Sequence, residues 1–180
     1  MDKEVLKLGG ILGAISLCVA LLLAVANFAT KDIIANRAAA DEEAALKVVM
    51  EQADEFKEIK TDKGVVFEAL NGGEKIGYCV KTSSAGYGGE ITMVIGVADG
   101  KVTGVSITGM NETPGLGAKA EKPEFTNQYK GASGSVALDK NGGDIAAISG
   151  ATITSKAVTE GVNTALAVAA ELEGGAEDGE

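Results

Sequence analysis

The chain has 180 residues, of which 46% are hydrophobic, enough for one folded domain and an accessory segment. It contains no His, no Trp and only two cysteines, Cys18 and Cys79, which excludes a His-ligated haem, a four-Cys iron–sulfur cluster, a Cys/His zinc site and a Ser-His-Asp triad. Its 16 basic and 26 acidic residues give a net charge of −10, the wrong sign for binding nucleic acid.

The N-terminal segment is long and apolar enough to cross a membrane. Residues 8–30 contain no charged residue. As a helix they would span about 35 Å, compared with about 30 Å for the bilayer core. We therefore predict a stub at residues 1–7 and a transmembrane helix at 8–30. A cleavable signal peptide is the alternative, because residues 24–26 are Ala-Val-Ala, but the apolar region of such a peptide is usually shorter. A lipid anchor at Cys18 is excluded by the large Leu17 before it.

Basic residues flank the span on both sides, so their number does not decide its orientation. We expect a single-pass protein of the bacterial cell membrane. The N-terminus should lie in the cytoplasm and the larger, acidic part outside, because long domains are exported largely regardless of charge. Cys18 would then lie in lipid and Cys79 outside, and no intramolecular disulfide is expected.

The exported domain is expected at residues 31–172. It begins with an Ala-rich linker, 31–40, and continues with an amphipathic helix at 41–56, where Leu46, Val49, Met50 and Ala53 have helical spacing.

Short apolar runs separated by Gly, Asn and Asp then predict antiparallel strands. These runs are residues 65–70, 75–81, 90–98 and 101–108. An irregular segment, 109–139, and a final helix, 155–172, follow. Strands followed by a terminal helix predict the α+β class, here an antiparallel sheet with flanking helices behind one transmembrane helix. Residues 173–180 are predicted to be a flexible acidic tail.

Hydroxyl groups and a glycine gather immediately before the final helix, where residues 149–155 read Ser-Gly-Ala-Thr-Ile-Thr-Ser. The first N–H groups of a helix have no partner within it and lie at the positive end of its dipole. The segment is therefore either a helix N-cap or a site for a phosphate group.

Two further segments are rich in turn-forming residues. Residues 112–117 read Glu-Thr-Pro-Gly-Leu-Gly, and residues 86–89 read Gly-Tyr-Gly-Gly. Each is either a surface turn or a place where the backbone can approach a flat ligand closely, and Glu112 could accept hydrogen bonds from ring or ribose donors. ATP-binding and dinucleotide-binding fingerprints are absent from the sequence.

Together, in this order behind one N-terminal span, the three segments resemble the flavin-binding G subunit of the Rnf electron transport complex. The related C subunit of the sodium-pumping NADH:quinone reductase shares the last motif. The resemblance implies an FMN cofactor joined through its 5′-phosphate to the Thr that closes Ser-Gly-Ala-Thr, here Thr152. It further implies cofactor-binding roles for residues of segments 149–155 and 112–117. These residues are Ser149, Gly150, Ala151, Thr154, Glu112, Thr113, Gly115 and Leu116. No metal site and no catalytic residue is expected.

The implied function is a membrane-anchored electron carrier, not catalytic alone. Its complex would couple electron transfer between ferredoxin and NAD to transport of Na⁺ or H⁺. Partners would be other integral-membrane and redox subunits and, during maturation, a flavin-attaching transferase. The family's motif has an Asp six residues before the modified Thr. This chain has Ala146 there and Asp144 two residues earlier, so either Asp144 substitutes through a shifted loop or recognition by the transferase is weakened.

Two other functions remain open: the C subunit of the quinone reductase, and an exported module that binds an anionic ligand without a covalent bond. A Ser155/Lys156 hydrolase is disfavoured because adjacent residues on a helix do not face each other. Aromatic residues such as Tyr78, Tyr87 and Phe125 are more typical of the core than of a flavin contact.

Overall fold

The computed structural model describes residues 3–61 and 64–174. It contains two compact units, Met1–Ala40 and Asp41–Glu180. Residues 1–2 of the predicted stub and 175–180 of the predicted tail lie outside the described residues. The helices are α1 (Lys3–Val49), α2 (Pro123–Thr126) and α3 (Thr152–Gly174), and the strands are β1 (Glu55–Thr61), β2 (Gly64–Asn71), β3 (Glu74–Ala85), β4 (Glu90–Ala98) and β5 (Lys101–Gly109). Short 3₁₀ helices occur at Gly117–Glu121, Asn127–Tyr129 and Asp139–Asn141.

Helix α1 runs without interruption through the predicted linker. The expectation of a linker at residues 31–40 was wrong, because a segment rich in alanine has high helix propensity and lacks Gly and Pro. Val5 and the large apolar side chains from Leu8 to Ile34 are exposed. Among the described residues, α1 is the one helix whose length and composition are sufficient to cross a membrane.

The C-terminal end of α1, in the second unit, packs on the sheet. The helix ends at Val49, earlier than the predicted residue 56. Two tertiary contacts explain this difference. Thr103 donates a hydrogen bond from its hydroxyl to the Val49 carbonyl, and the N–H of Asp54 bonds to the Leu70 carbonyl at 2.9 Å, which directs the chain into β1.

The sheet has five antiparallel strands in the order β1-β2-β3-β4-β5. The four predicted strands are all present, and β4 has the predicted bounds. Strand β1 was not predicted. It is an edge strand with a single neighbour, and its sequence, Glu-Phe-Lys-Glu-Ile-Lys-Thr, carries charges that are typical of protected edges. Its two apolar residues, Phe56 and Ile59, are three positions apart and give no alternating pattern.

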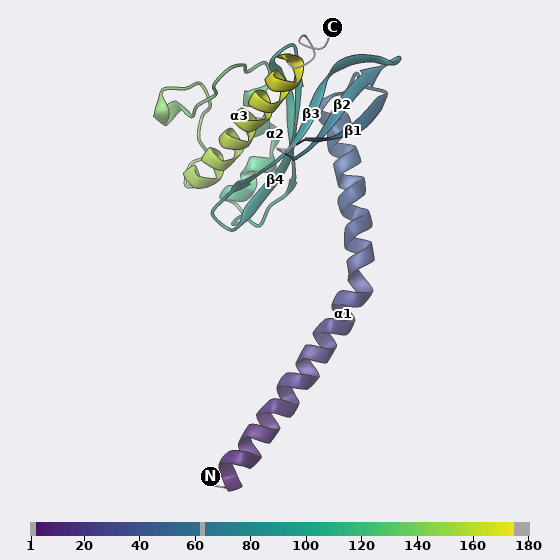
Figure 1. Ribbon diagram of the computed structural model, residues 1–180. Helices are drawn as coiled ribbons and strands as arrows, with labels where there is room; N and C mark the ends of the chain where they lie inside the picture. The colour runs from purple at the N-terminus through teal and green to yellow at the C-terminus, as the bar shows by residue number, and fades with distance from the viewer. Residues whose placement is uncertain (1–2, 62–63, 175–180) are drawn as a thin grey trace. The chain divides into compact units, whose positions relative to one another are not determined.

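Each face of the sheet is covered by a different helix. Ile91, Met93, Ile95 and Val97 of β4 belong to the apolar cluster under α3, while Val94 belongs to the cluster under the end of α1. Figure 1 shows α3 running along its face of the sheet. Full burial of a Val or Ile side chain contributes about 1.5–3 kcal/mol, so alternation along this one inner strand stabilises both layers.

Two glycines permit the close approach of α1. Gly96 of β4 and Gly104 of β5 are paired in register. A Cβ atom at Gly96 would lie 2.5 Å from the Val49 carbonyl oxygen, and one at Gly104 would lie 3.1 Å from the Val49 Cα. These positions therefore leave room for the backbone at the helix end.

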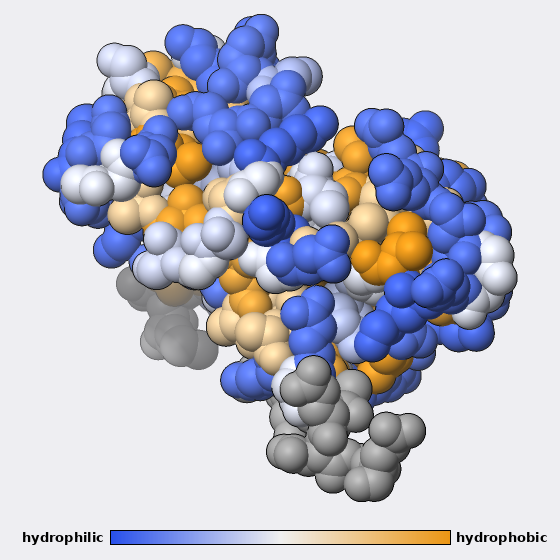
Figure 2. Space-filling model, turned by 90° about the horizontal axis from the view of Figure 1, so that it is seen from above, coloured by the Kyte–Doolittle hydropathy of each residue, from blue (hydrophilic) through white to orange (hydrophobic). Residues whose placement is uncertain are grey.

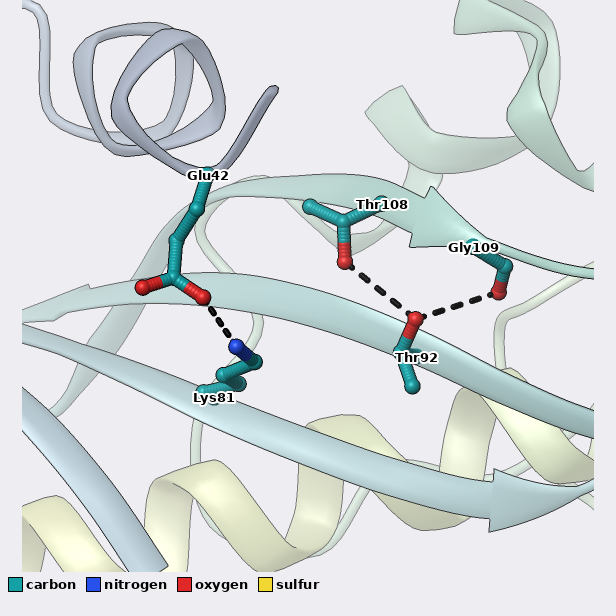
Figure 3. A network of polar contacts seen from close by, with 5 residues as sticks. All are labelled: Glu42, Lys81, Thr92, Thr108 and Gly109. Carbon is teal, nitrogen blue, oxygen red and sulfur yellow. Dashed lines mark hydrogen bonds and ion pairs between the residues drawn. The ribbon is translucent and has the colours of Figure 1, made fainter. Parts of the chain in front are cut away.

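Polar contacts add to this face (Figure 3). Lys81 of β3 pairs with Glu42 of α1, and Thr92 of β4 hydrogen-bonds with Thr108 and with the Gly109 carbonyl across to β5. The Lys81 side chain is 41% exposed, so solvent screens the ion pair and limits its contribution to about 1 kcal/mol or less. Apolar packing, not this pair, holds the helix end in place.

Helix α3 begins at Thr152, three residues earlier than predicted. Its first intrahelical hydrogen bond runs from the Ser155 N–H to the Ala151 carbonyl at 3.0 Å. Ala151, which has no capping side chain, therefore precedes the helix. The Ser155 hydroxyl bonds backwards instead, donating to the Ala151 carbonyl at 3.0 Å and accepting from the Ile148 N–H at 2.9 Å. Ser149, Thr152 and Thr154 therefore do not occupy the N-cap position of α3.

Candidate functional site

A buried carboxylate joins the three motif segments. Glu112, which follows β5, is 9% exposed. Its Oε1 accepts the N–H groups of Tyr87 at 2.7 Å and Gly88 at 3.1 Å, in the loop between β3 and β4. Its Oε2 accepts the hydroxyl of Thr154, in the first turn of α3, at 2.9 Å. Glu112 thus accepts its hydrogen bonds from the protein itself, whereas the sequence suggested that the donors would belong to a ligand.

The glycines of these segments surround Glu112. A Cβ at Gly86 would lie 2.3 Å from Glu112 Oε1, and one at Gly117 would lie 2.4 Å from Glu112 Oε2. At Gly88 it would lie 1.8 Å from the Asn111 carbonyl oxygen. These three glycines are thus required by the packing of the segments on one another. Gly115, with φ of +79° and no atom near its Cβ position, is a turn residue.

A cavity of about 490 Å³ lies where the segments meet. It is lined by Tyr87, by four residues of 112–117 and by residues 150–154. Its size is within the range of about 300–1,000 Å³ typical of small-molecule sites. Of the predicted site residues, seven line it, namely Glu112, Thr113, Leu116, Gly150, Ala151, Thr152 and Thr154. Ser149 and Gly115 do not.

Apolar side chains are exposed around this cavity. In the described part of the second unit, the exposed large apolar side chains are Val48, Tyr87, Leu116 and Ile153, and all but Val48 line the cavity. The face drawn in Figure 2 is mostly hydrophilic, with small apolar areas between charged and polar ones. Apolar walls gathered at one hollow indicate a ligand with an apolar surface.

Tyr87 differs from the expectation for aromatic residues. Tyr78 and Phe125 are buried in the core as expected, whereas Tyr87 is 71% exposed at the cavity. The sequence did contain a signal of this exposure: Tyr87 stands among three glycines, which have no side chains to bury it. Ile153 and Gly117 were also missed as cavity residues.

Polar groups accompany the apolar side chains. Thr152, the first residue of α3, presents its hydroxyl at the cavity, and the Lys140 ammonium lies 3.4 Å from this oxygen. The N–H groups of Thr152, Ile153 and Thr154 precede the first intrahelical hydrogen bond and have no acceptor within the helix. This set of donors is suited to an anion.

Hydrogen bonds hold the segment before Thr152 in place at Ala146 and at the preceding residue, Ile145. The Gln128 side-chain amide accepts from the Ala146 N–H at 2.8 Å and donates to its carbonyl at 3.4 Å. Ile145 is buried, and its carbonyl accepts the Asp139 N–H at 2.8 Å. Asp144 is exposed and is separated from Ala146 by the buried Ile145.

Other hollows are less suitable. Ser149 lines a shallow one of about 320 Å³, together with Lys119, Lys122 and Ala146. A larger hollow of about 590 Å³ lies beside Met50, Gly77 and Asp99, and none of the predicted site residues lines it. The motif residues and the exposed apolar side chains coincide at the 490 Å³ cavity, which we therefore take as the candidate site.

The residues at this cavity fit FMN by their chemistry. FMN combines a flat, largely apolar ring system with a phosphate. Tyr87, Leu116 and Ile153 offer apolar contact area, and the first turn of α3 together with Lys140 offers donors to an anion.

Comparison with known proteins gives consistent findings. The family model of the FMN-binding domain matches residues 86–167, and that of the RnfG N-terminal region matches residues 1–49. The chain is 38% identical to the G subunit of the proton-translocating ferredoxin:NAD(+) oxidoreductase complex of Clostridium ljungdahlii, over 86% of each chain. It is 37% identical to the G subunit of the Na(+)-translocating ferredoxin:NAD(+) oxidoreductase complex of Acetobacterium woodii, over 92% of each. Among solved structures it is similar to the C subunit of the Na(+)-translocating NADH-quinone reductase of Parabacteroides distasonis, with a TM-score of 0.48, 35% identity, and coverage of 57% of this chain and 58% of that chain.

Proposed function

This chain belongs to the family formed by the G subunits of Rnf-type ion-translocating oxidoreductase complexes, and on that premise we propose that it carries electrons through FMN attached covalently at Thr152. The observation that carries the proposal is the cavity at which Thr152 and three exposed apolar side chains come together, with the Lys140 ammonium 3.4 Å from the Thr152 hydroxyl oxygen. Bound FMN supplies the electron chemistry, and the protein supplies position, electrostatics and access.

The apolar side chains explain how a bound flavin could exchange electrons with the rest of the complex. Tyr87, Leu116 and Ile153 are 71%, 43% and 54% exposed, so the walls of the cavity reach the protein surface. A ring system held between them would remain accessible to a donor and an acceptor. These would be other integral-membrane and redox subunits of the complex.

Covalent attachment needs an activated flavin phosphate. Joining FMN itself to a threonine would release water, which is unfavourable in aqueous solution. A flavin dinucleotide resolves the balance: the Thr152 oxygen bonds to the flavin-side phosphorus, the pyrophosphate bond breaks, and the nucleoside monophosphate leaves with the bonding electrons. The hydroxyl proton passes to a base of the transferase that matures the protein. Because Ala146 stands in place of the motif Asp, this chain contributes no side-chain carboxylate at that position.

The test is to purify the full chain from membranes of cells that contain the flavin-attaching transferase, denature it and examine the gel band under ultraviolet light. We expect flavin fluorescence in the band, and an intact mass greater by one FMN less one water. Flavin that is released on denaturation would instead support the alternative of a non-covalent ligand-binding module. A colourless protein before and after denaturation would contradict the proposed function, because the chain would then hold no flavin.

We further propose that α1 anchors the protein in the membrane with the N-terminus in the cytoplasm and the FMN-binding domain outside. The support is the length and apolar exposure of α1, together with the large acidic part after it, since long domains are exported largely regardless of charge. A reporter enzyme that is active only outside the cytoplasm, fused after the last residue, is expected to be active. Activity of a cytoplasm-specific reporter at the same position would overturn this orientation.

A further inference from the structure

We infer that Lys140 is the positioning residue that pairs with the phosphate of a flavin attached at Thr152. This inference rests on the proposed function and deepens it, by naming the side chain that compensates the charge of the attached group. Neither the three motif segments nor their spacing points to Lys140, which lies outside all of them.

The position of the ammonium group is the first observation. Lys140 Nζ lies 3.4 Å from Thr152 Oγ1, the atom that would become the ester oxygen. The non-bridging phosphate oxygens would be one phosphorus atom away from that oxygen, within reach of the flexible lysine side chain. Lysine provides three donors on a compact charge, which suits a phosphate that approaches from variable directions.

The charges around Lys140 are the second observation. Within residues 3–61 and 64–174, no carboxylate oxygen is recorded within 4.0 Å of its ammonium, although the chain has an excess of acidic residues. Asp139 is adjacent in sequence, but its Oδ1 accepts the backbone N–H groups of Lys140 at 2.7 Å and Ala147 at 3.4 Å. The Asp139 carboxylate therefore accepts hydrogen bonds from the backbone and does not pair with the Lys140 ammonium. The Lys140 charge is available to another anion.

The local fold presents Lys140 to Thr152 from a compact turn. The short helix Asp139–Asn141 is closed by hydrogen bonds from the N–H groups of Asn141 and Gly143 to the Leu138 carbonyl, at 2.8 and 3.0 Å. Leu138 is buried and pairs with Ile145 in a parallel bridge. The turn that carries Lys140 and the segment that leads to Thr152 are thus anchored together.

The charge balance explains the need for such a residue. A phosphodiester at Thr152 retains one negative charge, and the cavity's own ionisable carboxylate, Glu112, is also negative and already accepts three hydrogen bonds. None of the residues that line the cavity is basic. A charge-assisted contact from Lys140 would stabilise the phosphate against this background and hold it toward the first turn of α3.

The experiment compares the full chain with its Lys140→Ala and Lys140→Arg variants, using purified flavin-attaching transferase and flavin dinucleotide. Lys57→Ala is the matched control, because Lys57 is exposed on β1 and lines no part of the cavity. We expect Lys140→Ala to acquire covalent flavin roughly tenfold more slowly, as measured by in-gel fluorescence, since a hydrogen bond to a charged group is lost. Lys140→Arg should recover most of the rate, and Lys57→Ala should match the wild type.

A second readout separates this role from a loss of structure. The phosphorus NMR resonance of the fully labelled protein should move in Lys140→Ala and return toward the wild-type position in Lys140→Arg, while the thermal midpoint stays unchanged. Equal rates and an unchanged resonance in Lys140→Ala would overturn the inference while leaving the proposed function intact. No labelling of the wild type would instead contradict covalent attachment, and the inference with it.

Discussion

Thr152→Ala is expected to abolish covalent flavin completely. Alanine has no oxygen with which to form the phosphoester, and the other changes to the cavity are small because Thr152 is an exposed residue at the start of α3. Thr152→Ser keeps a hydroxyl on the same Cβ and should be labelled. The measurement is fluorescence of the denatured band together with intact mass, for variants produced beside the transferase.

The matched control for this experiment is Thr164→Ala. Thr164 is an exposed threonine of the same helix, and its hydroxyl donates to the Glu160 carbonyl at 2.9 Å, away from the candidate site. It should be labelled like the wild type. If Thr152→Ala remained fluorescent after denaturation, the attachment residue would be a different one and the assignment of Thr152 would be wrong.

Glu112→Ala is expected to lower the free energy of unfolding by about 2–4 kcal/mol. The change removes three hydrogen bonds to a buried carboxylate and leaves the Tyr87 and Gly88 N–H groups and the Thr154 hydroxyl without their acceptor. Each such loss costs about 1–3 kcal/mol when the donor is buried, and water can replace the carboxylate at the more exposed loop. Urea unfolding of the full chain in detergent, followed by circular dichroism, measures the difference.

The same substitution should also slow flavin attachment, because Glu112 holds the loop at residues 112–117 against the first turn of α3. Glu112→Gln keeps the shape and one acceptor oxygen, and should lie between Glu112→Ala and the wild type. Glu90→Ala, which removes an exposed carboxylate at the start of β4, is the control and should change stability by no more than about 0.5 kcal/mol. A Glu112→Ala protein as stable as this control would show that the three segments are held together by other contacts.

The layout of the sheet could be predicted from local sequence because its strands alternate and its turns are short. The run at 90–98 coincides with β4, and Asp99-Gly100 forms the turn to β5, with φ of +50° and +67°. Edge strand β1 could not be predicted in this way, since its pattern of charges reflects exposure to solvent. The end of α1 at Val49 depends on Thr103, which lies on β5 far along the chain.

The sequence alone determined the class of fold, the apolar span and the three segments that supply the lining of the cavity, because these follow from periodicity and composition within short stretches. Only the tertiary structure decided what these residues do to one another. It directed both oxygens of Glu112 to the protein, brought exposed Tyr87 to the cavity and placed Lys140 beside Thr152. The physical reason is that hydrogen bonds and charge pairing depend on distance in space, and the chain separates Tyr87, Glu112, Lys140 and Thr152 by turns and strands whose packing no local pattern encodes.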